Sequence, residues 1–449
     1  MAKRVSLAAA CVLLAQHAVA QQATNSFEVS VGARASDNIA RVQDGTSGTT
    51  VTAGLILDAE RKSGELQYAA NADLDYLHYF NQAFSSEVLG QFTGTATYQF
   101  IPQSISWVTE EHLGQVTTDY FLAPGPRNRQ YLNLFSTGPD VRLRLADTLA
   151  LRLSARYGRD DYQTSPYSDA RLSGEAALER RPSESALVSL GFGHERINYV
   201  QEAAKPGDFA VNRYFAGYAL QGAVTTIDLQ AGYAQSFDGL VQLGGPTGHI
   251  VLQRKVGAWG SVDLNASRTL DTVTPGARAT DFLPGVVDYP RAEVLTGTLF
   301  FANSAELAYR LQRPRNSLDV AAVVSNETDH KDIRPNRDTL QAGAKFMHRL
   351  TPLAQAGVFV SWMQDTLHNA QIPGFPTGDF KSAETDYGLQ LRLRFSRVLV
   401  ASLDLTRDRR VAELGPFRES AVWVRMAYAP VPASVQHKAG DAAPDVVPR

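Results

Sequence analysis

The sequence predicts an all-β protein, a single antiparallel β-barrel of about 18–20 strands that spans a membrane. Three observations predict this fold. The chain begins with a secretory signal, apolar and polar residues alternate over long segments, and the connections between those segments alternate between short and long. Composition does not distinguish a membrane barrel from a soluble all-β protein, because 449 residues with 44% hydrophobic content and a mean hydropathy of −0.20 suit both classes equally well.

The first twenty residues have the three parts of a secretory signal peptide. Lys3 and Arg4 are positively charged, residues 5–14 are largely apolar, and Ala18-Val19-Ala20 forms a cleavage site of the A-x-A type. Cleavage there would change the formal net charge from −3 to −5 and remove Cys11, the only cysteine. A mature chain without cysteine excludes disulfides, thiolate metal sites and a cysteine nucleophile. Its mild acidity argues against a nucleic-acid partner.

Beyond the signal, no apolar run approaches the roughly 18 residues that a membrane-spanning helix needs. The segment 88–100 instead alternates at every residue. One face carries Val88, Gly90, Phe92, Gly94, Ala96, Tyr98 and Phe100, and the other carries Leu89, Gln91, Thr93, Thr95, Thr97 and Gln99. Segments 66–80, 149–157 and 387–395 alternate in the same way.

The length of these segments favours a barrel over a soluble sandwich. They run for about ten residues or more, which suits a tilted strand that crosses a bilayer, whereas soluble strands average about five or six. Each apolar face is continuous and has aromatic residues near its ends, as an aromatic girdle requires. The opposite faces carry charges that could not lie unpaired in a dry core.

Short and long connections take turns along the chain, as they do in outer-membrane barrels. The short ones include Arg61–Gly64, Ile101–Ser104, Ala146–Thr148, Arg181–Glu184, Arg313–Asn316 and Phe395–Arg397. The long ones include Phe121–Gln130, Glu202–Ala210, Val273–Arg291 and His368–Phe380.

We expect three parts in the chain: a signal peptide over 1–20, an outer-membrane barrel over 21–430 and a disordered tail over 431–449. The first strand is expected at Ser26–Ser36 and the last at Ala421–Tyr428. A first strand so close to the cleavage site leaves no room for a plug domain. The segments Val294–Phe301 and His249–Gly257 are ambiguous between strand and loop.

Five short motifs follow one another in the first third of the mature chain. They are Ser36-Asp37-Asn38-Ile39-Ala40-Arg41, Ser106-Trp107-Val108, Gly114-Gln115-Val116, Asn128-Arg129-Gln130 and Phe135-Ser136-Thr137-Gly138-Pro139-Asp140. This order resembles the β-barrel porins of exopolysaccharide operons, the EpsL-like outer-membrane proteins. The resemblance implies a barrel associated with surface polysaccharide production or export, and it brings no catalytic residues.

Two groups of charged residues are candidates for the lining of the lumen, because they oppose the apolar faces. The basic group is Arg142, Arg144, Arg152, Arg156, Arg392 and Arg394, and the acidic group is Asp73 and Asp75, with Glu175 and Glu179 further on. Rings of lumen charge tune ion selectivity, and guanidinium groups bind carboxylates with two hydrogen bonds. The alternative is that opposite charges on neighbouring strands pair and merely solvate the lumen.

No residues point to catalysis, a metal or a cofactor. In Glu110-Glu111-His112, successive side chains of a strand face opposite ways, so only Glu110 and His112 can act together, and a structural histidine is the better interpretation. The sequence has no G-x-S-x-G, H-E-x-x-H or Walker motif. A non-enzymatic protein without a metal or cofactor is expected.

The sequence therefore predicts a passive conduit in the bacterial cell outer membrane, linked to exopolysaccharide export or biosynthesis. Its expected partners are outer-membrane lipid, periplasmic polysaccharide-export proteins and an acidic polysaccharide. A general or solute-specific diffusion porin and a non-conducting structural barrel are the alternatives.

Overall fold

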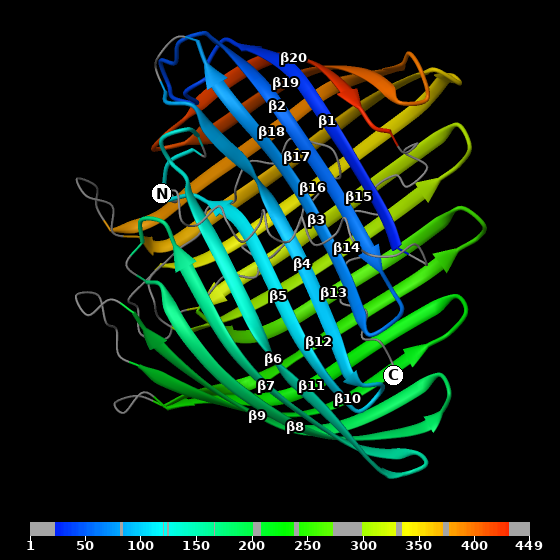
Figure 1. Cartoon of the computed structure of the whole chain (residues 1–449). Coiled ribbons are helices and arrows are strands. Elements are labelled where there is room, and N and C mark those ends of the chain that lie inside the picture. The colour runs from blue at the N-terminus through cyan, green and yellow to red at the C-terminus, as the bar shows by residue number, and fades with distance from the viewer. Residues whose placement is uncertain are drawn as a thin grey trace.

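Twenty antiparallel strands form one closed barrel in the computed structural model (Figure 1). The structure describes residues 23–80, 84–119, 121–123, 125–165, 167–200, 208–237, 242–272, 299–328, 335–370 and 377–430. Each strand pairs with the next, and β1 (Ala23–Ser36) pairs with β20 (Phe417–Tyr428) to close the ring. The predicted fold class is confirmed, at the upper end of the expected strand number. The signal peptide and the tail lie outside the described residues.

The remaining strands have lengths that suit a tilted crossing of a bilayer. They are β2 (Gly48–Arg61), β3 (Leu66–Tyr79), β4 (Glu87–Ile101), β5 (Ile105–Val116), β6 (Gln130–Ala146), β7 (Leu149–Tyr162), β8 (Asp169–Ser183), β9 (Ala186–Tyr199), β10 (Phe209–Gln221), β11 (Thr225–Phe237), β12 (Gln242–Val256), β13 (Gly260–Asp271), β14 (Phe300–Gln312), β15 (Asn316–Thr328), β16 (Asn336–Thr351), β17 (Ala354–Ala370), β18 (Gly378–Arg394) and β19 (Leu399–Ala412).

Several strand boundaries differ from the prediction, because hydrogen-bonded pairing extends strands past the apolar pattern. β1 begins at Ala23 and β20 at Phe417, both earlier than expected. The ambiguous segment His249–Gly257 lies almost entirely in β12. The expected loop His368–Phe380 is shorter than predicted, since β17 runs to Ala370 and β18 starts at Gly378. Residues 273–298, which include the expected loop Val273–Arg291, and residues 202–207 lie outside the described part of the chain.

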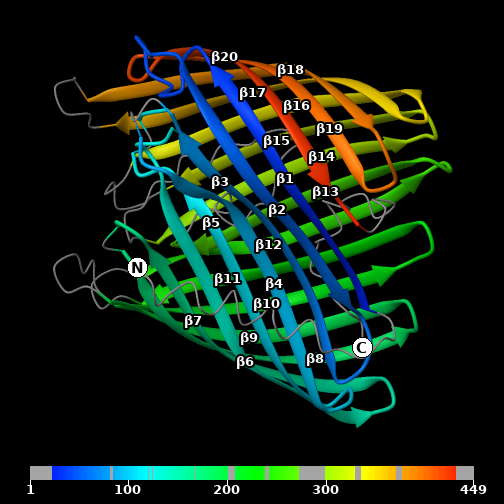
Figure 2. The same cartoon turned by 45° about the horizontal axis from the view of Figure 1, so that its top comes forward.

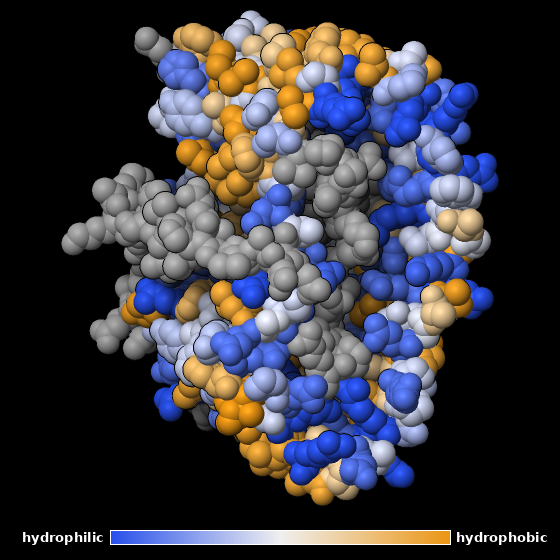
Figure 3. All heavy atoms as spheres, turned by 45° about the vertical axis from the view of Figure 1, so that its right-hand side comes forward, coloured by the Kyte–Doolittle hydropathy of each residue, from blue (hydrophilic) through white to orange (hydrophobic). Residues whose placement is uncertain are grey.

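The predicted apolar faces form the outer surface of the barrel. Along β4, Val88, Tyr98 and Phe100 are 45%, 41% and 59% exposed, which suits a wall that lies against lipid. Figure 3 shows apolar residues over the barrel wall and hydrophilic residues around the end that carries the short turns. Among the described residues, no helix is long and apolar enough to cross a membrane.

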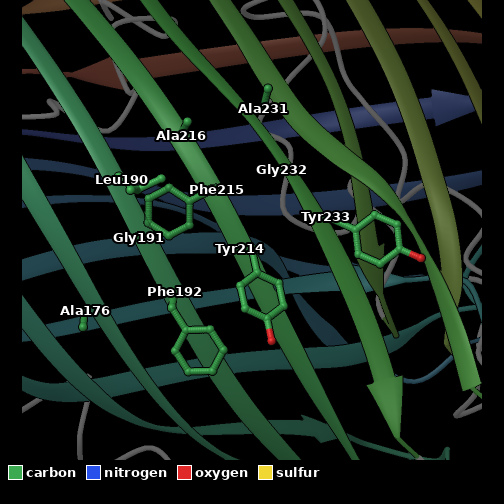
Figure 4. A pocket seen from close by; sticks show the side chains of 10 residues that line it. All are labelled: Ala176, Leu190, Gly191, Phe192, Tyr214, Phe215, Ala216, Ala231, Gly232 and Tyr233. Atoms are coloured by element: carbon green, nitrogen blue, oxygen red, sulfur yellow. The ribbon is translucent and has the colours of Figure 1, made fainter.

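Part of an aromatic girdle crosses three neighbouring strands. Phe192 lies opposite Tyr214, and Tyr214 lies opposite Tyr233, in the register of β9, β10 and β11. Their rings border a shallow apolar groove whose floor includes Ala216 and Ala231 (Figure 4). Such a girdle marks the level where the hydrocarbon of a membrane meets its headgroups.

Short and long connections lie at opposite ends of the barrel (Figures 1 and 2). Turns such as 62–65 and 147–148 close one end, and connections such as 37–47 and 117–129 leave the other. In outer-membrane barrels the short turns face the periplasm, so the long connections mark the outer mouth. Strand number, closure, apolar wall and loop asymmetry together identify a β-barrel of the outer-membrane type.

Candidate functional site: the charged lumen and its outer mouth

The inner wall carries the predicted lumen arginines of β6 and β7, and three of them are paired. Arg142 lies 2.8 Å from Glu179, and Arg156 lies 2.7 Å from Asp140. Arg152 bridges two carboxylates of β8, Glu175 at 2.7 Å and Glu179 at 2.9 Å. Arg152 and Arg156 pair with carboxylates of neighbouring strands, as in the alternative interpretation, whereas Arg142 reaches past β7 to Glu179 of β8.

The other three predicted arginines, Arg144, Arg392 and Arg394, lie near the short-turn end, where their side chains are exposed to solvent. The side chain of Arg144 is 75% exposed and lies 3.5 Å from Asp147, which is fully exposed. Arg392 and Arg394 are exposed on β18, and neither has an ion pair within 4.0 Å among the described residues. This part of the predicted basic group can contact a solute that enters from the periplasmic side.

The predicted carboxylates Asp73 and Asp75 lie on the inner face of β3, away from the β6–β7 arginines. Asp75 interacts electrostatically with Arg425 of β20, across the closing seam of the barrel. Asp404 of β19 interacts electrostatically with Arg425, Arg392 and Lys345. The acidic candidates thus belong to a network that the sequence prediction missed.

This network continues along the wall as a belt of alternating charge. Asp319 of β15 interacts with Lys345 and with Arg310, and Arg310 lies 3.2 Å from Asp263 of β13. All these side chains alternate with outward apolar residues. The period-two pattern that selected the original candidates could therefore have found them too. The pattern does not give the strand register, and the register determines which of these charged side chains lie next to one another.

The connection 37–47 folds back onto the inner wall at the outer mouth. The side-chain amide of Asn38 holds it with two hydrogen bonds, which it donates to the backbone oxygens of Val42 at 2.6 Å and Arg418 at 2.9 Å. A Cβ atom on Gly45 would lie 1.6 Å from the side-chain oxygen of Asn38, so this close approach requires glycine. Arg41 adopts a positive φ of 56°, which turns its side chain toward the wall.

Arg41 is the anchor of this connection, and it is only 3% exposed. Its guanidinium lies 2.8 Å from Glu384, 3.4 Å from Asp408 and 3.6 Å from Glu419. The same group stacks over Phe417, 4.4 Å from the ring centroid. A cation bonded to three carboxylates of β18, β19 and β20 fixes the connection to the wall.

The connection 117–129 reinforces this arrangement. The Asn128 amide donates to the backbone oxygens of Asp119 at 2.7 Å and Ala123 at 3.1 Å, which closes the turn. Arg410 of β19 donates to the Phe121 oxygen at 3.0 Å. A Cβ atom on Gly125 would lie 3.2 Å from the oxygen of Ala40, so the two connections touch each other. Together they line the outer mouth on one side of the ring.

A second buried cation lies on the other side of the ring, on β8. Arg171 is surrounded by four carboxylates, Asp160 at 2.7 Å, Asp169 at 2.9 Å, Asp271 at 3.5 Å and Glu195 at 3.6 Å. Because Asp271 ends β13, this contact draws the outer end of β13 across the mouth toward β8. At Arg171 the four carboxylates outnumber the cations, even with Arg213, which lies 2.6 Å from Glu195. At Arg41 the three carboxylates are also met by Arg34, 2.8 Å from Glu419, and by Arg410, which interacts with Glu384. The excess of negative charge at the mouth therefore lies on the β8 side.

The same bend buries an apolar cluster. Leu270 and Phe301, paired at the outer ends of β13 and β14, are 2% and 1% exposed. They pack with Val211 of β10 and Ala234 of β11. The mouth is therefore narrowed by strand ends and by connections that have defined contacts.

The residues Glu110 and His112 face the lumen, as their alternation predicts. His112 Nδ1 lies 3.1 Å from the Thr93 hydroxyl, which fits a structural role. In the described ranges, no group of three His, Cys, Asp or Glu side chains is arranged to hold a metal ion.

Two of the motifs that carry the family resemblance coincide with the mouth. Asn38 and Arg41 belong to the first motif, and Asn128 and Arg129 to the fourth. Arg129 forms an ion pair with Glu87 and contacts the Tyr79 hydroxyl at 3.2 Å. The sequence drew attention to these positions without giving them a role, because their partners lie far away along the chain.

No family model matches the sequence, and no curated protein matches it. Several solved structures are similar to the barrel. The siderophore receptor PirA from Pseudomonas aeruginosa is 11% identical, with 91% of this chain and 80% of that chain covered and a TM-score of 0.41. The apoprotein form of the FrpB iron transporter from Neisseria meningitidis is 9% identical, with 90% of this chain and 81% of that chain covered and a TM-score of 0.45. OpdO from Pseudomonas aeruginosa is 12% identical, with 92% of this chain and 98% of that chain covered and a TM-score of 0.36. No inference about cargo follows from likenesses this distant.

Proposed function

We propose that this protein is a passive conduit across the bacterial outer membrane. The observation that carries the proposal is a closed ring of twenty strands whose inner wall is lined by ion pairs and polar groups while its outer wall is apolar. Barrels of roughly 16–18 strands leave an aqueous channel, whereas those of about 22 are plugged. A wall this polar suits hydrated solutes, and passage requires no chemistry.

The charge of the lumen changes along its axis. A solute from the periplasm first meets the exposed Arg144, Arg392 and Arg394, and later passes the acidic cluster around Arg171. Arginines at an entrance raise the local concentration of anionic solutes.

The test of conduction is single-channel recording of the purified full-length protein in a planar bilayer, with reversal potentials measured in a salt gradient. Folded and inserted protein that conducts supports the conduit. Folded and inserted protein without conductance would instead favour a structural barrel, which is the main alternative.

Removing the exposed periplasmic arginines is expected to change ion selectivity without disturbing the fold. In the double variant Arg392→Ala and Arg394→Ala, the permeability ratio should shift toward cations by about twofold or more, since two exposed positive charges leave the entrance. Among the described residues neither arginine has an ion pair within 4.0 Å, and Arg392 loses its interaction with Asp404. Arg180→Ala is the matched control, because Arg180 is exposed on the outer face of β8 near the same end. Equal shifts in the double variant and the control would contradict a functional basic entrance.

For the cargo, we propose an acidic surface polysaccharide that periplasmic export proteins deliver. The resemblance of the first third of the mature chain to EpsL-like proteins and the exposed arginines support this assignment. Deleting the gene should reduce the polysaccharide at the cell surface and leave polysaccharide in the periplasm, as measured by fractionation and uronic-acid assay. An unchanged surface polysaccharide together with a conducting protein would favour a general or solute-specific porin.

A further inference from the structure

Three arginines lie on the outer, lipid-facing surface near the mouth. Arg407 and Arg409 of β19 and Arg418 of β20 are exposed, and they alternate with the buried Asp408 and Glu419. The apolar residues on the same face are exposed too, namely Leu405, Val411, Val422 and Val424. The three side chains therefore point away from the lumen, into the surroundings of the barrel.

Their height on the wall corresponds to the headgroups of the membrane. Arg407 lies opposite Tyr387 of β18, which is 46% exposed. Arg409 lies in a cross-strand row with Thr385 of β18 and Trp362 of β17. Outward tyrosine and tryptophan mark the boundary between hydrocarbon and headgroups. The arginines consequently meet the polar part of the outer leaflet.

The register makes this arrangement unfavourable without a ligand. Arg409 and Arg418 are direct partners across the β19–β20 pair, and like charges in that relation destabilise a sheet. None of the three arginines has an ion pair within 4.0 Å among the described residues. Asp37 is a nearby carboxylate that bonds to the backbone of β20. Its Oδ1 accepts a hydrogen bond from the Ser420 backbone nitrogen at 2.7 Å, and its backbone nitrogen donates to the Ser420 oxygen at 3.1 Å.

Polar groups elsewhere on the outward rim bond to one another. Asn326 donates to Asp338 at 2.6 Å, and His368 bridges Asp338 at 3.0 Å and Asp379 at 3.2 Å. Arg159 of β7 pairs with Asp161 at 2.8 Å. The cluster on β19 and β20 differs from this pattern, because it concentrates positive charge and leaves it facing outward.

We propose that Arg407, Arg409 and Arg418 form a binding site for the phosphate of a phosphorylated glycolipid in the outer leaflet. Guanidinium groups donate paired hydrogen bonds to phosphate, and a phosphate between Arg409 and Arg418 would cancel their mutual repulsion. The neighbouring aromatic side chains, Tyr387 opposite Arg407 and Trp362 in the row of Arg409, offer an apolar surface for the first part of the acyl chains.

The experiment measures binding of lipopolysaccharide to the full-length protein in detergent, with the variant Arg409→Gln plus Arg418→Gln. The variant should bind at least about tenfold more weakly, which corresponds to a loss of two charge-assisted phosphate contacts. Arg180→Gln on the same outer surface, at the other end of the barrel, should bind as the parent does. Circular dichroism and the heat-induced gel shift establish that all three proteins are folded.

Two further probes identify the ligand chemistry. Lipopolysaccharide stripped of phosphate should bind the parent as weakly as intact lipopolysaccharide binds the variant. Phosphatidylglycerol vesicles should bind both proteins weakly. Unchanged lipopolysaccharide affinity in the folded double variant would overturn the site. Equal affinity of the parent for phosphatidylglycerol would overturn the glycolipid assignment in favour of anionic lipid in general.

Discussion

Replacing Arg41 by methionine is expected to open the outer mouth. The guanidinium holds the carboxylates of Glu384, Asp408 and Glu419, and methionine fills a similar volume without the charge. Removing one partner of a buried ionic cluster costs on the order of 3–5 kcal/mol, so the connection 37–47 should detach from the wall. Single-channel conductance should rise, cation selectivity should increase, and the amides of 37–47 should exchange hydrogen faster.

Two further variants separate the charge from the position of the connection. Gly45→Ala would force its Cβ into Asn38, whose amide is held in place by two backbone oxygens. It should raise conductance and exchange in 37–47 without changing the net charge, whereas Arg41→Lys should be intermediate. Normal conductance and normal exchange in Arg41→Met would show that the connection does not control the mouth.

Replacing Arg171 by methionine is expected to cause the largest loss of stability. Four carboxylates surround this guanidinium, and two of them, Asp160 and Asp169, are 4% and 1% exposed. Without the cation, these groups repel one another in a buried environment. The free energy of unfolding should fall by about 3–5 kcal/mol or more, measured by urea unfolding of the protein inserted in lipid vesicles.

Arg159→Met is the matched control, because it removes an arginine from the neighbouring strand β7. Among the described residues Arg159 forms one ion pair, with Asp161, and its side chain is 43% exposed. Its loss should cost less than about 1 kcal/mol, as for other exposed pairs. Similar losses in the two variants would mean that the cluster around Arg171 contributes no more than a surface pair.

The fold could be predicted from the sequence because lipid imposes a local rule. A wall that faces lipid on one side and water on the other produces alternation at every second residue, as in 88–100, and this pattern needs no knowledge of distant contacts. The same rule placed Asp73, Asp75 and the six arginines on strands of the barrel wall. Alternation also places Glu110 and His112 on the opposite face of the strand from Glu111.

The outer mouth could not be predicted in this way, because its contacts join distant parts of the chain. Arg41 meets Glu384, Asp408 and Glu419 only once the ring has closed. Asp271 meets Arg171 because the end of β13 leaves its neighbour β12. Alternation identifies the face of a side chain but gives neither its partner nor a bend at a strand end.

The pairing between β1 and β20 closes the ring over a shorter length than the pairing between β1 and β2. β1 is paired with β2 along its whole length, from Ala23 opposite Arg61 to Ser36 opposite Gly48, but with β20 only from Val29 to Ser36. The last joint to form is therefore a short one, made between the two ends of the described strands. In hydrocarbon an unpaired strand edge is costly. The edge of β1 that faces β20 can be paired only after the last strand of the barrel has been made, so closure of the ring joins the earliest and the latest strands of the described chain.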